Sequence, residues 1–136
     1  MAEWQGTLTY LNYSSPQTFT LAVAARGEMT RPDQLLLRFD YQEPNQSHVY
    51  GTDTLTLAAG GTRLRWDDVD YTVQAKQWLP GQTLHLVLEA QGRDNDRAAT
   101  IRKTLTLSPR QFTLRKEVRY AAADAFFQRN QFQLAR

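Results

Sequence analysis

The sequence predicts an all-β domain whose strands run antiparallel in an up-and-down meander. Apolar and polar residues alternate with a period of two along most of the chain, helical periodicity is scarce, and turn signals recur about every 8 to 12 residues. Nearly every connection is short enough for a hairpin, so strands that are adjacent in sequence should pair. Closing such a meander removes its two exposed edges. We therefore expect a barrel of eight to ten strands rather than a sandwich.

Alternation identifies five strands in the first half of the chain. Ser14-Ser15-Pro16 ends the first strand, and Glu43-Pro44-Asn45 closes the third. Gly60-Gly61 follows the fourth strand and suits a tight hairpin, which requires positive φ. The fifth strand is short and ends at Asp67-Asp68. The expected strands are 4–13 (Trp4, Gly6, Leu8, Tyr10), 19–27 (Phe19, Leu21, Val23), 35–41 (Leu35, Leu37, Phe39, Tyr41), 48–57 (Val49, Gly51, Asp53, Leu55, Leu57) and 63–66 (Arg63, Leu64, Trp66).

Five further strands are expected in the second half. Residues 79–82 and Ser108-Pro109 supply turns, and residues 92–96 are interpreted as a long polar hairpin tip. Residues 121–125 form either one helical turn or a loop. The expected strands are 69–75 (Val69, Tyr71, Val73, Ala75), 84–90 (Leu84, Leu86, Leu88, Ala90), 101–107 (Ile101, Lys103, Leu105, Leu107), 112–118 (Phe112, Leu114, Lys116, Val118) and 126–134 (Phe126, Gln128, Asn130, Phe132, Leu134).

Length and composition limit the function classes. The 136 residues are expected to form one domain, 1–136, and the net charge of +2 comes without any block of like charge, which argues against a nucleic-acid partner. No run approaches the roughly 18 apolar residues of a membrane span, so the chain is expected to be soluble. There is no cysteine and no recognisable signal peptide. The compartment stays open between the cytoplasm and export with the signal peptide absent from this chain.

Trp4-Gln5-Gly6, at the start of the first strand of an antiparallel meander, resembles the opening of calycin barrels. This superfamily includes lipocalins, fatty-acid-binding proteins, avidins and nitrobindin-like proteins. The resemblance implies a barrel that holds a small apolar molecule. It also implies that Trp4 and Gly6 lie at the closed end of the barrel, with a basic side chain from a late strand, Arg119 or Arg129, covering the tryptophan through a cation–π contact.

The chain departs from two branches of that superfamily. Ser14-Ser15-Pro16 leaves no room for the helical pair of fatty-acid-binding proteins, and their late Arg-x-Tyr pair is missing because Arg119 and Tyr120 are adjacent. The two histidines, His48 and His85, lie in mid-chain, whereas nitrobindin-like proteins bind haem through a late histidine. We therefore expect no haem or other cofactor.

Polar residues interrupt otherwise apolar strand faces at a few positions. A lone charge inside a barrel is costly, so such residues must be paired, hydrated or bound to a ligand. The last three strands are neighbours, which places their polar residues on one patch of sheet, and Asp53 can lie opposite them. Two interpretations remain open: cationic anchors for an anionic head group, or lysines that a β-bulge turns outward or that reach the rim. The residues are Lys103, Lys116, Gln128, Asn130 and Asp53.

Other polar motifs favour structural roles. Asp94-Asn95-Asp96 only faintly resembles a calcium loop and is interpreted as a solvated turn, and His48 and His85 lack partners at metal-ligand spacing. The three carboxylates of residues 67–70 surround a turn and are expected to face water. The four serines fall at turns without an evident base, so no serine nucleophile is predicted.

Three functions from different classes follow. The first is a non-enzymatic binder of a small apolar or amphipathic, possibly anionic, ligand, with its cavity lined by aromatic residues and its anion held by Lys103 and Lys116. The second is a barrel filled by its own side chains that acts through its surface as a partner-binding module of the cell envelope. The third is an enzyme that uses Asp53 and the lysines for acid/base work. The cavity-lining residues are expected to be Trp4, Tyr10, Phe39, Tyr71 and Phe112.

Overall fold

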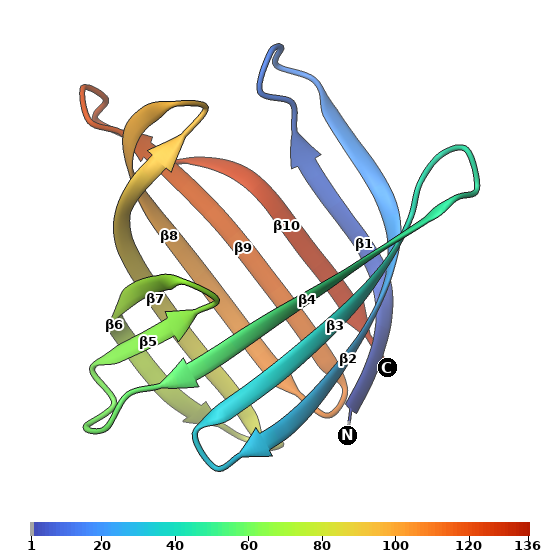
Figure 1. The fold of residues 1–136 in the computed structure, drawn as a ribbon, viewed down its shortest axis with the longest axis vertical. Helices are drawn as coiled ribbons and strands as arrows, with labels where there is room; N and C mark the ends of the chain where they lie inside the picture. The colour runs from blue at the N-terminus through green and yellow to red at the C-terminus, as the bar shows by residue number, and fades with distance from the viewer. Residues whose placement is uncertain (1) are drawn as a thin grey trace.

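The computed structural model describes residues 2–136 as ten antiparallel strands that close into a barrel (Figure 1). The predicted fold class is confirmed: each strand pairs with its neighbours in sequence, and β1 pairs with β10. Among the described residues no helix is long and apolar enough to cross a membrane. The strands are β1 (Ala2–Leu11), β2 (Thr18–Arg31), β3 (Gln34–Gln42), β4 (His48–Leu57), β5 (Arg63–Trp66), β6 (Val69–Leu79), β7 (Thr83–Asp94), β8 (Arg97–Ser108), β9 (Gln111–Tyr120) and β10 (Phe127–Ala135).

The closure of the barrel depends on a close approach between β1 and β10. Gly6 lies opposite Leu134, and a Cβ added to Gly6 would stand 2.0 Å from the carbonyl oxygen of Gln133. Only glycine fits this position, because the neighbouring atoms belong to the backbone of β10. Gly6 thus has a structural role where the first and last strands meet.

Four aromatic side chains pack against one another inside the barrel. The ring of Phe39 lies 5.2 Å from that of Phe132 and 6.0 Å from that of Phe112, and Phe112 lies 5.4 Å from Trp4. These four side chains are buried. They come from β1, β3, β9 and β10, so their contacts connect opposite walls of the barrel.

One predicted connection differs in the structure, and one that the sequence left open is resolved. The polar tip expected at residues 92–96 is wrong: β7 and β8 pair as far as Asp94 and Arg97, which leaves only Asn95 and Asp96 as the turn. Both have positive φ, 51° and 60°, the conformation of the tight type I′ hairpin turn. Residues 121–125 form a loop, not a helical turn.

Two β-bulges change which side chains face inward. In β10 the register shifts between Gln128 and Asn130, so Arg129 is the extra residue and is buried, whereas Gln128 is exposed. The expectation that Gln128 faces inward is therefore wrong. In β6 the shift lies between Val73 and Ala75, so beyond it the inward positions are those opposite Leu86 and Leu84. A bulge reverses the facing of all later residues relative to strict alternation.

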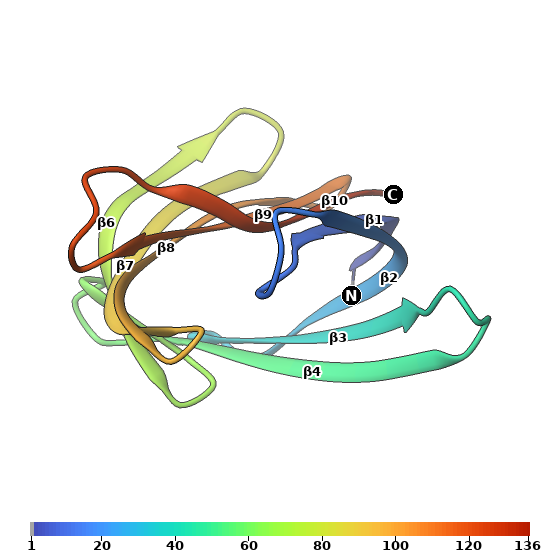
Figure 2. The same ribbon diagram turned by 90° about the horizontal axis from the view of Figure 1, so that it is seen from above.

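The wall is not hydrogen-bonded over its full height. β4 pairs with β5 only at Leu55–Leu57, and β6 pairs with β7 only as far as Thr72 and Glu89. Within residues 2–136, the upper parts of β4 (48–54) and β7 (90–94) therefore each lack a strand partner on one side. In Figure 2 the β3–β4 hairpin extends beyond the rest of the barrel.

Candidate functional site

An open cavity of about 1010 Å³ lies at the end of the barrel where β1 begins. Residues of β1, of the β2–β3, β6–β7 and β8–β9 hairpins and of β4 and β5 line it. In Figure 1 these three hairpins lie at the same end of the barrel. Leucines dominate the wall, because leucine occupies the inward-facing positions of β3, β4, β5, β7 and β8 near this end of the barrel. The lining leucines are Leu35, Leu55, Leu57, Leu64, Leu84, Leu86, Leu105 and Leu107.

The mouth of the cavity is also partly apolar. Trp78 is 67% exposed and Met29 60% exposed, and both line the cavity. Trp78 and Lys76 pair with Leu84 and Leu86, which makes them inward-facing residues beyond the bulge in β6. Strict alternation of the sequence missed both residues. Val73 and Ala75 are both apolar and two residues apart, so the alternation continues through the bulge and the sequence does not show that the facing changes there. Large exposed apolar side chains at a cavity mouth are typical of a binding site.

The aromatic residues predicted to line the cavity are dispersed. Trp4 does line it, and its indole N–H donates a hydrogen bond of 3.0 Å to the carbonyl of Ser108. Phe39 and Phe112 belong to the aromatic cluster in the middle of the barrel. The remaining two pack elsewhere: Tyr71 lies against Trp66 with ring centroids 6.5 Å apart, and Tyr10 stacks on Phe19 at 5.6 Å.

The polar residues predicted on the inner face form a row across four strands. Lys103 lies directly opposite Lys116, Lys116 opposite Asn130, and Asn130 opposite Tyr10. No bulge interrupts β8 or its pairing with β9, so strict alternation holds and both lysines face inward. Like charges directly opposite each other are unfavourable, so this row carries an electrostatic cost.

Lys103 lies over aromatic rings. Its Nζ is 3.9 Å from the centroid of the Trp66 ring and 5.3 Å from that of Tyr71, which is cation–π geometry. Burial lowers the pKa of Lys103 to about 8, and the charge of Lys116 adds to this effect, whereas Asp53 opposes it. The pKa of Lys116 is also lowered, mainly by burial.

Asp53 lies beside this lysine, as predicted from its position on β4. Its Oδ2 accepts a hydrogen bond of 3.0 Å from the indole N–H of Trp66. Burial raises the pKa of Asp53, although the bond from Trp66 and the charge of Lys103 act in the opposite direction. The group therefore combines an acid and an amine, each of whose charged forms is destabilised by burial.

We expect the free energy of unfolding to rise between pH 8 and 10, mainly because of Lys103, with Lys116 contributing in the same direction. Its pKa is about 8 in the folded chain and 10.5 ordinarily, so over this interval the unfolded chain binds more protons and folding is increasingly favoured. The pKa values of Tyr41 and Tyr71 are raised to about 12, and their linkage opposes the rise only above about pH 10. Urea denaturation at several pH values measures the effect. Lys103→Met should abolish most of the rise, and an unchanged slope in that variant would contradict the assignment.

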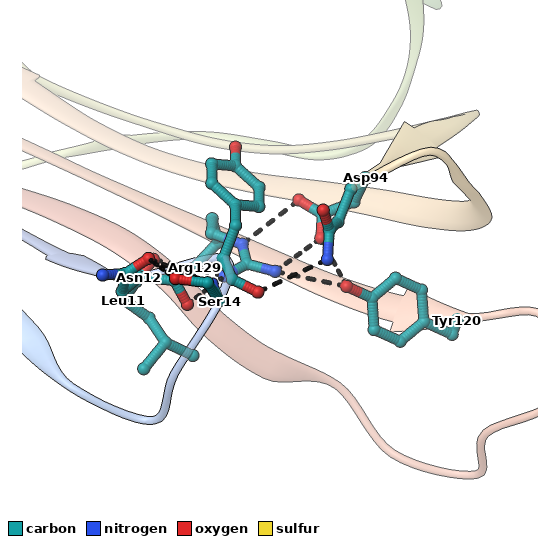
Figure 3. A network of polar contacts seen from close by, with 8 residues as sticks. Leu11, Asn12, Ser14, Asp94, Tyr120 and Arg129 are labelled. Atoms are coloured by element: carbon teal, nitrogen blue, oxygen red, sulfur yellow. Dashed lines mark hydrogen bonds and ion pairs between the residues drawn. The ribbon is translucent and has the colours of Figure 1, made fainter.

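A buried ion pair between Arg129 and Asp94 lies near the opposite end of the barrel, and Figure 3 shows its polar contacts. Arg129 Nε donates to Asp94 Oδ1 at 3.1 Å, the hydroxyl of Tyr120 donates to Asp94 Oδ2 at 2.7 Å, and Arg129 Nη1 donates to the carbonyl of Leu11 at 3.2 Å. Burial alone would raise the pKa of Asp94, but the hydrogen bonds from Arg129 and Tyr120 lower it below its ordinary value. Asp94 is thus an ion-pair residue, not the solvated turn residue predicted from the sequence.

Neither arginine lies where the calycin resemblance placed it. The guanidinium of Arg119 lies 4.9 Å from the ring of Phe126, and that of Arg129 lies 4.3 Å from the ring of Tyr13. Trp4 is near the opposite end of the barrel, because Gln5 pairs with Ala135, the far end of β10 from Arg129. The expected cation–π cover of Trp4 is therefore wrong, and the Trp4 end contains the open cavity.

Comparison of the chain with protein-family models, with curated proteins and with solved structures gives no significant match. At a coarse level the closed antiparallel barrel of ten strands agrees with a calycin-like barrel. The function must therefore be argued from the cavity and its surroundings.

Proposed function

We propose that this protein binds an apolar or amphipathic small molecule in the cavity at the Trp4 end of a calycin-like barrel. The observation that carries the proposal is the cavity of about 1010 Å³ with its leucine wall and its exposed apolar mouth. Ligand pockets of proteins are mostly apolar concavities of about 300–1,000 Å³. The volume suits an extended acyl or polycyclic ligand.

The chemistry of the wall supports an apolar ligand. Eight leucines and Trp4 present hydrocarbon surface, and the polar lining side chains, such as Glu28, Asp33 and Lys76, belong to the strand ends and hairpins around the mouth. Burying apolar surface contributes about 25 cal/mol per Å², so a ligand gains affinity from the area that it removes from water. Polar groups at the rim contact the part of the ligand that remains hydrated.

The lysine row supports an anionic preference. Lys103 and Leu105 are two residues apart on the same face of β8, about 7 Å along the strand, and Leu105 lines the cavity. A ligand whose tail contacts Leu105 can place a head group near Lys103 and Lys116. An anionic head would offset the repulsion between these two cations, and the side chain of Asn130 offers a further hydrogen-bond donor.

Blocking the cavity is expected to weaken ligand binding at least tenfold, about 1.4 kcal/mol. Leu107→Trp adds volume at a half-buried wall position, whereas Thr106→Trp adds the same side chain to the outer face of the same strand. Titration with the apolar fluorophore N-phenyl-1-naphthylamine measures the dissociation constant for both variants. We expect the Thr106 variant to bind like the unmodified chain. Equal affinity in all three proteins would place the fluorophore outside the cavity and contradict the proposal.

Removing both lysine charges is expected to abolish the preference for an anionic ligand. In Lys103→Met/Lys116→Met, dodecanoate should bind no better than dodecanol, whereas the unmodified chain should favour dodecanoate. The stability of the variant should be kept or raised, because two buried charges and their repulsion are removed. Competition with the fluorophore measures both affinities. A preserved preference for dodecanoate would show that the lysines are not the anion anchor and would leave the apolar site intact.

A surface interaction module is the second candidate. The packed aromatic cluster of Phe39, Phe112 and Phe132 favours it, because these side chains occupy part of the barrel interior themselves. The strand number favours the first candidate instead: eight strands suffice to close around packed side chains, whereas a barrel of ten strands is wider and leaves room for a cavity. Absence of fluorophore binding to the unmodified chain would favour this candidate over the carrier.

A further inference from the structure

The upper part of β4, residues 48–52, is an unpaired strand edge. The backbone N–H of Asp67 donates to the carbonyl of Thr54 at 2.8 Å, which shows that even-numbered residues of β4 turn their backbone groups away from β3. Odd-numbered residues turn toward β3, since Leu57 N–H donates to the carbonyl of Asp33. Because pairing with β5 begins at Leu55, the outward backbone groups of His48, Tyr50 and Thr52 have no strand partner within the described chain.

This edge lacks the features that normally prevent association. Proteins protect exposed edges with lysine, proline, inward-pointing charges, bulges or very short strands. The unpaired residues 48–52 read His-Val-Tyr-Gly-Thr and end just before the inward-facing Asp53, and their pairing with β3 is regular. Two apolar side chains are exposed instead: Tyr50 at 74% and Val49 at 49%. An edge of this kind is a template for another strand.

We propose that two copies of this protein associate through β4, with the two strands antiparallel across a two-fold axis at Tyr50. In this register residue i lies opposite residue 100 − i of the second copy, so His48 lies opposite Thr52 and Val49 opposite Gly51. Tyr50 then exchanges both backbone hydrogen bonds with its own copy, and His48 and Thr52 do the same with each other. All the outward groups of the edge are satisfied at once.

The side chains are compatible with this pairing. Val49 lies opposite Gly51, which has no side chain to oppose it. The space beside Gly51 is also open, because a Cβ added there would contact only the Tyr41 ring, 3.4 Å away. The two Tyr50 side chains meet on the outer face, and cross-strand aromatic pairs stabilise sheets. No like charges are opposed, because His48 faces Thr52 and is already hydrogen-bonded to Asp40 at 2.7 Å. A two-fold interface needs such a self-complementary patch, which favours a second copy over an unrelated peptide.

A single cysteine tests the register, because the chain contains no cysteine. Opposed hydrogen-bonded residues of antiparallel strands have Cα atoms about 5.5 Å apart, within the range that a disulfide bridges. Tyr50→Cys should therefore form a covalent dimer rapidly under mild oxidation. The matched control Asn45→Cys lies in the exposed β3–β4 connection, and its copy would be about 34 Å away in this register. Equal rates of cross-linking for the two variants would overturn the proposal.

A backbone variant separates edge pairing from other contacts. The N–H of Thr52 points away from β3, so Thr52→Pro removes a donor at the free edge without removing a bond inside the barrel. Thr52→Val keeps that donor. Light scattering over a wide concentration range should find dimers for the unmodified chain and for Thr52→Val, and monomers for Thr52→Pro. At concentrations low enough for all three to be monomeric, their denaturation midpoints should be similar, because association no longer stabilises the native state. A monomeric unmodified chain, or a dimer that Thr52→Pro leaves intact, would refute pairing through β4.

Discussion

Gly6→Ala is expected to lower the free energy of unfolding by at least about 3 kcal/mol. The new Cβ would stand 2.0 Å from the carbonyl oxygen of Gln133 and 2.8 Å from the Cα of Leu134, both backbone atoms of β10. Overpacking commonly costs about 1–3 kcal/mol, and here no flexible side chain can move aside. The strands must separate where β1 and β10 close the barrel. Urea denaturation followed by circular dichroism measures the loss.

Gly92→Ala is the matched control for this substitution. Gly92 also lies in a strand, but the nearest atom to an added Cβ is Ile101 Cγ1 at 3.7 Å, an ordinary contact. Alanine should be neutral or stabilising by about 0.5–1 kcal/mol, because glycine in a strand carries an entropic cost. If Gly6→Ala and Gly92→Ala had similar midpoints, the close approach of β1 and β10 would be contradicted.

Arg129→Met is expected to cost about 3–5 kcal/mol of stability. The side chains of Arg129 and Asp94 are 5% and 1% exposed, so removal of the guanidinium leaves a carboxylate buried without its counterion. The carbonyl of Leu11 loses a donor as well. Chemical denaturation of the single variant and of Asp94→Asn/Arg129→Met provides the comparison. The double variant should recover part of the loss because no uncompensated charge remains.

The pH dependence of the same pair gives an independent measurement. The pKa of Asp94 is lowered in the folded chain, so its contribution is fully present above the ordinary value of about 3.9 and is lost as the pH falls below it. The difference in stability between the unmodified chain and Asp94→Asn should therefore shrink below about pH 4. A cost of Arg129→Met below about 1 kcal/mol at pH 7 would show that the pair does not stabilise this end of the barrel.

The lysine row could be read from alternation alone because β8 and β9 are regular. Lys103 and Lys116 share a face with the buried Ile101 and Leu114, and no bulge intervenes. Gln128 was misplaced for the opposite reason: the shift in β10 depends on pairing with β9 and leaves no pattern in the local sequence, so the inward turn of Arg129 could not be seen there. The alternation of apolar and polar residues can be read along one strand, whereas a bulge is defined only by how two strands pair.

The cavity end was assigned incorrectly for a similar reason. The resemblance of Trp4-Gln5-Gly6 to calycin barrels implied a closed end, and Trp4 is indeed buried against Phe112. Whether an end is closed depends on how the hairpins surround it and on which side chains meet there. Trp78 faces this cavity only because of the bulge in β6, so its role was invisible in the sequence.

The amino-acid sequence was enough to predict the strand order and the antiparallel meander, and it marked Asp53, Lys103 and Lys116 as the polar residues on otherwise apolar strand faces. These features depend on hydrophobic alternation and short turns, which are local and therefore legible along the chain. Three features became visible only in three dimensions: which end is open, how Arg129 meets Asp94, and that among residues 2–136 the edge at Tyr50 has no strand partner. Each of these depends on the register between strands, and a shift of one residue changes which side chains and backbone groups meet.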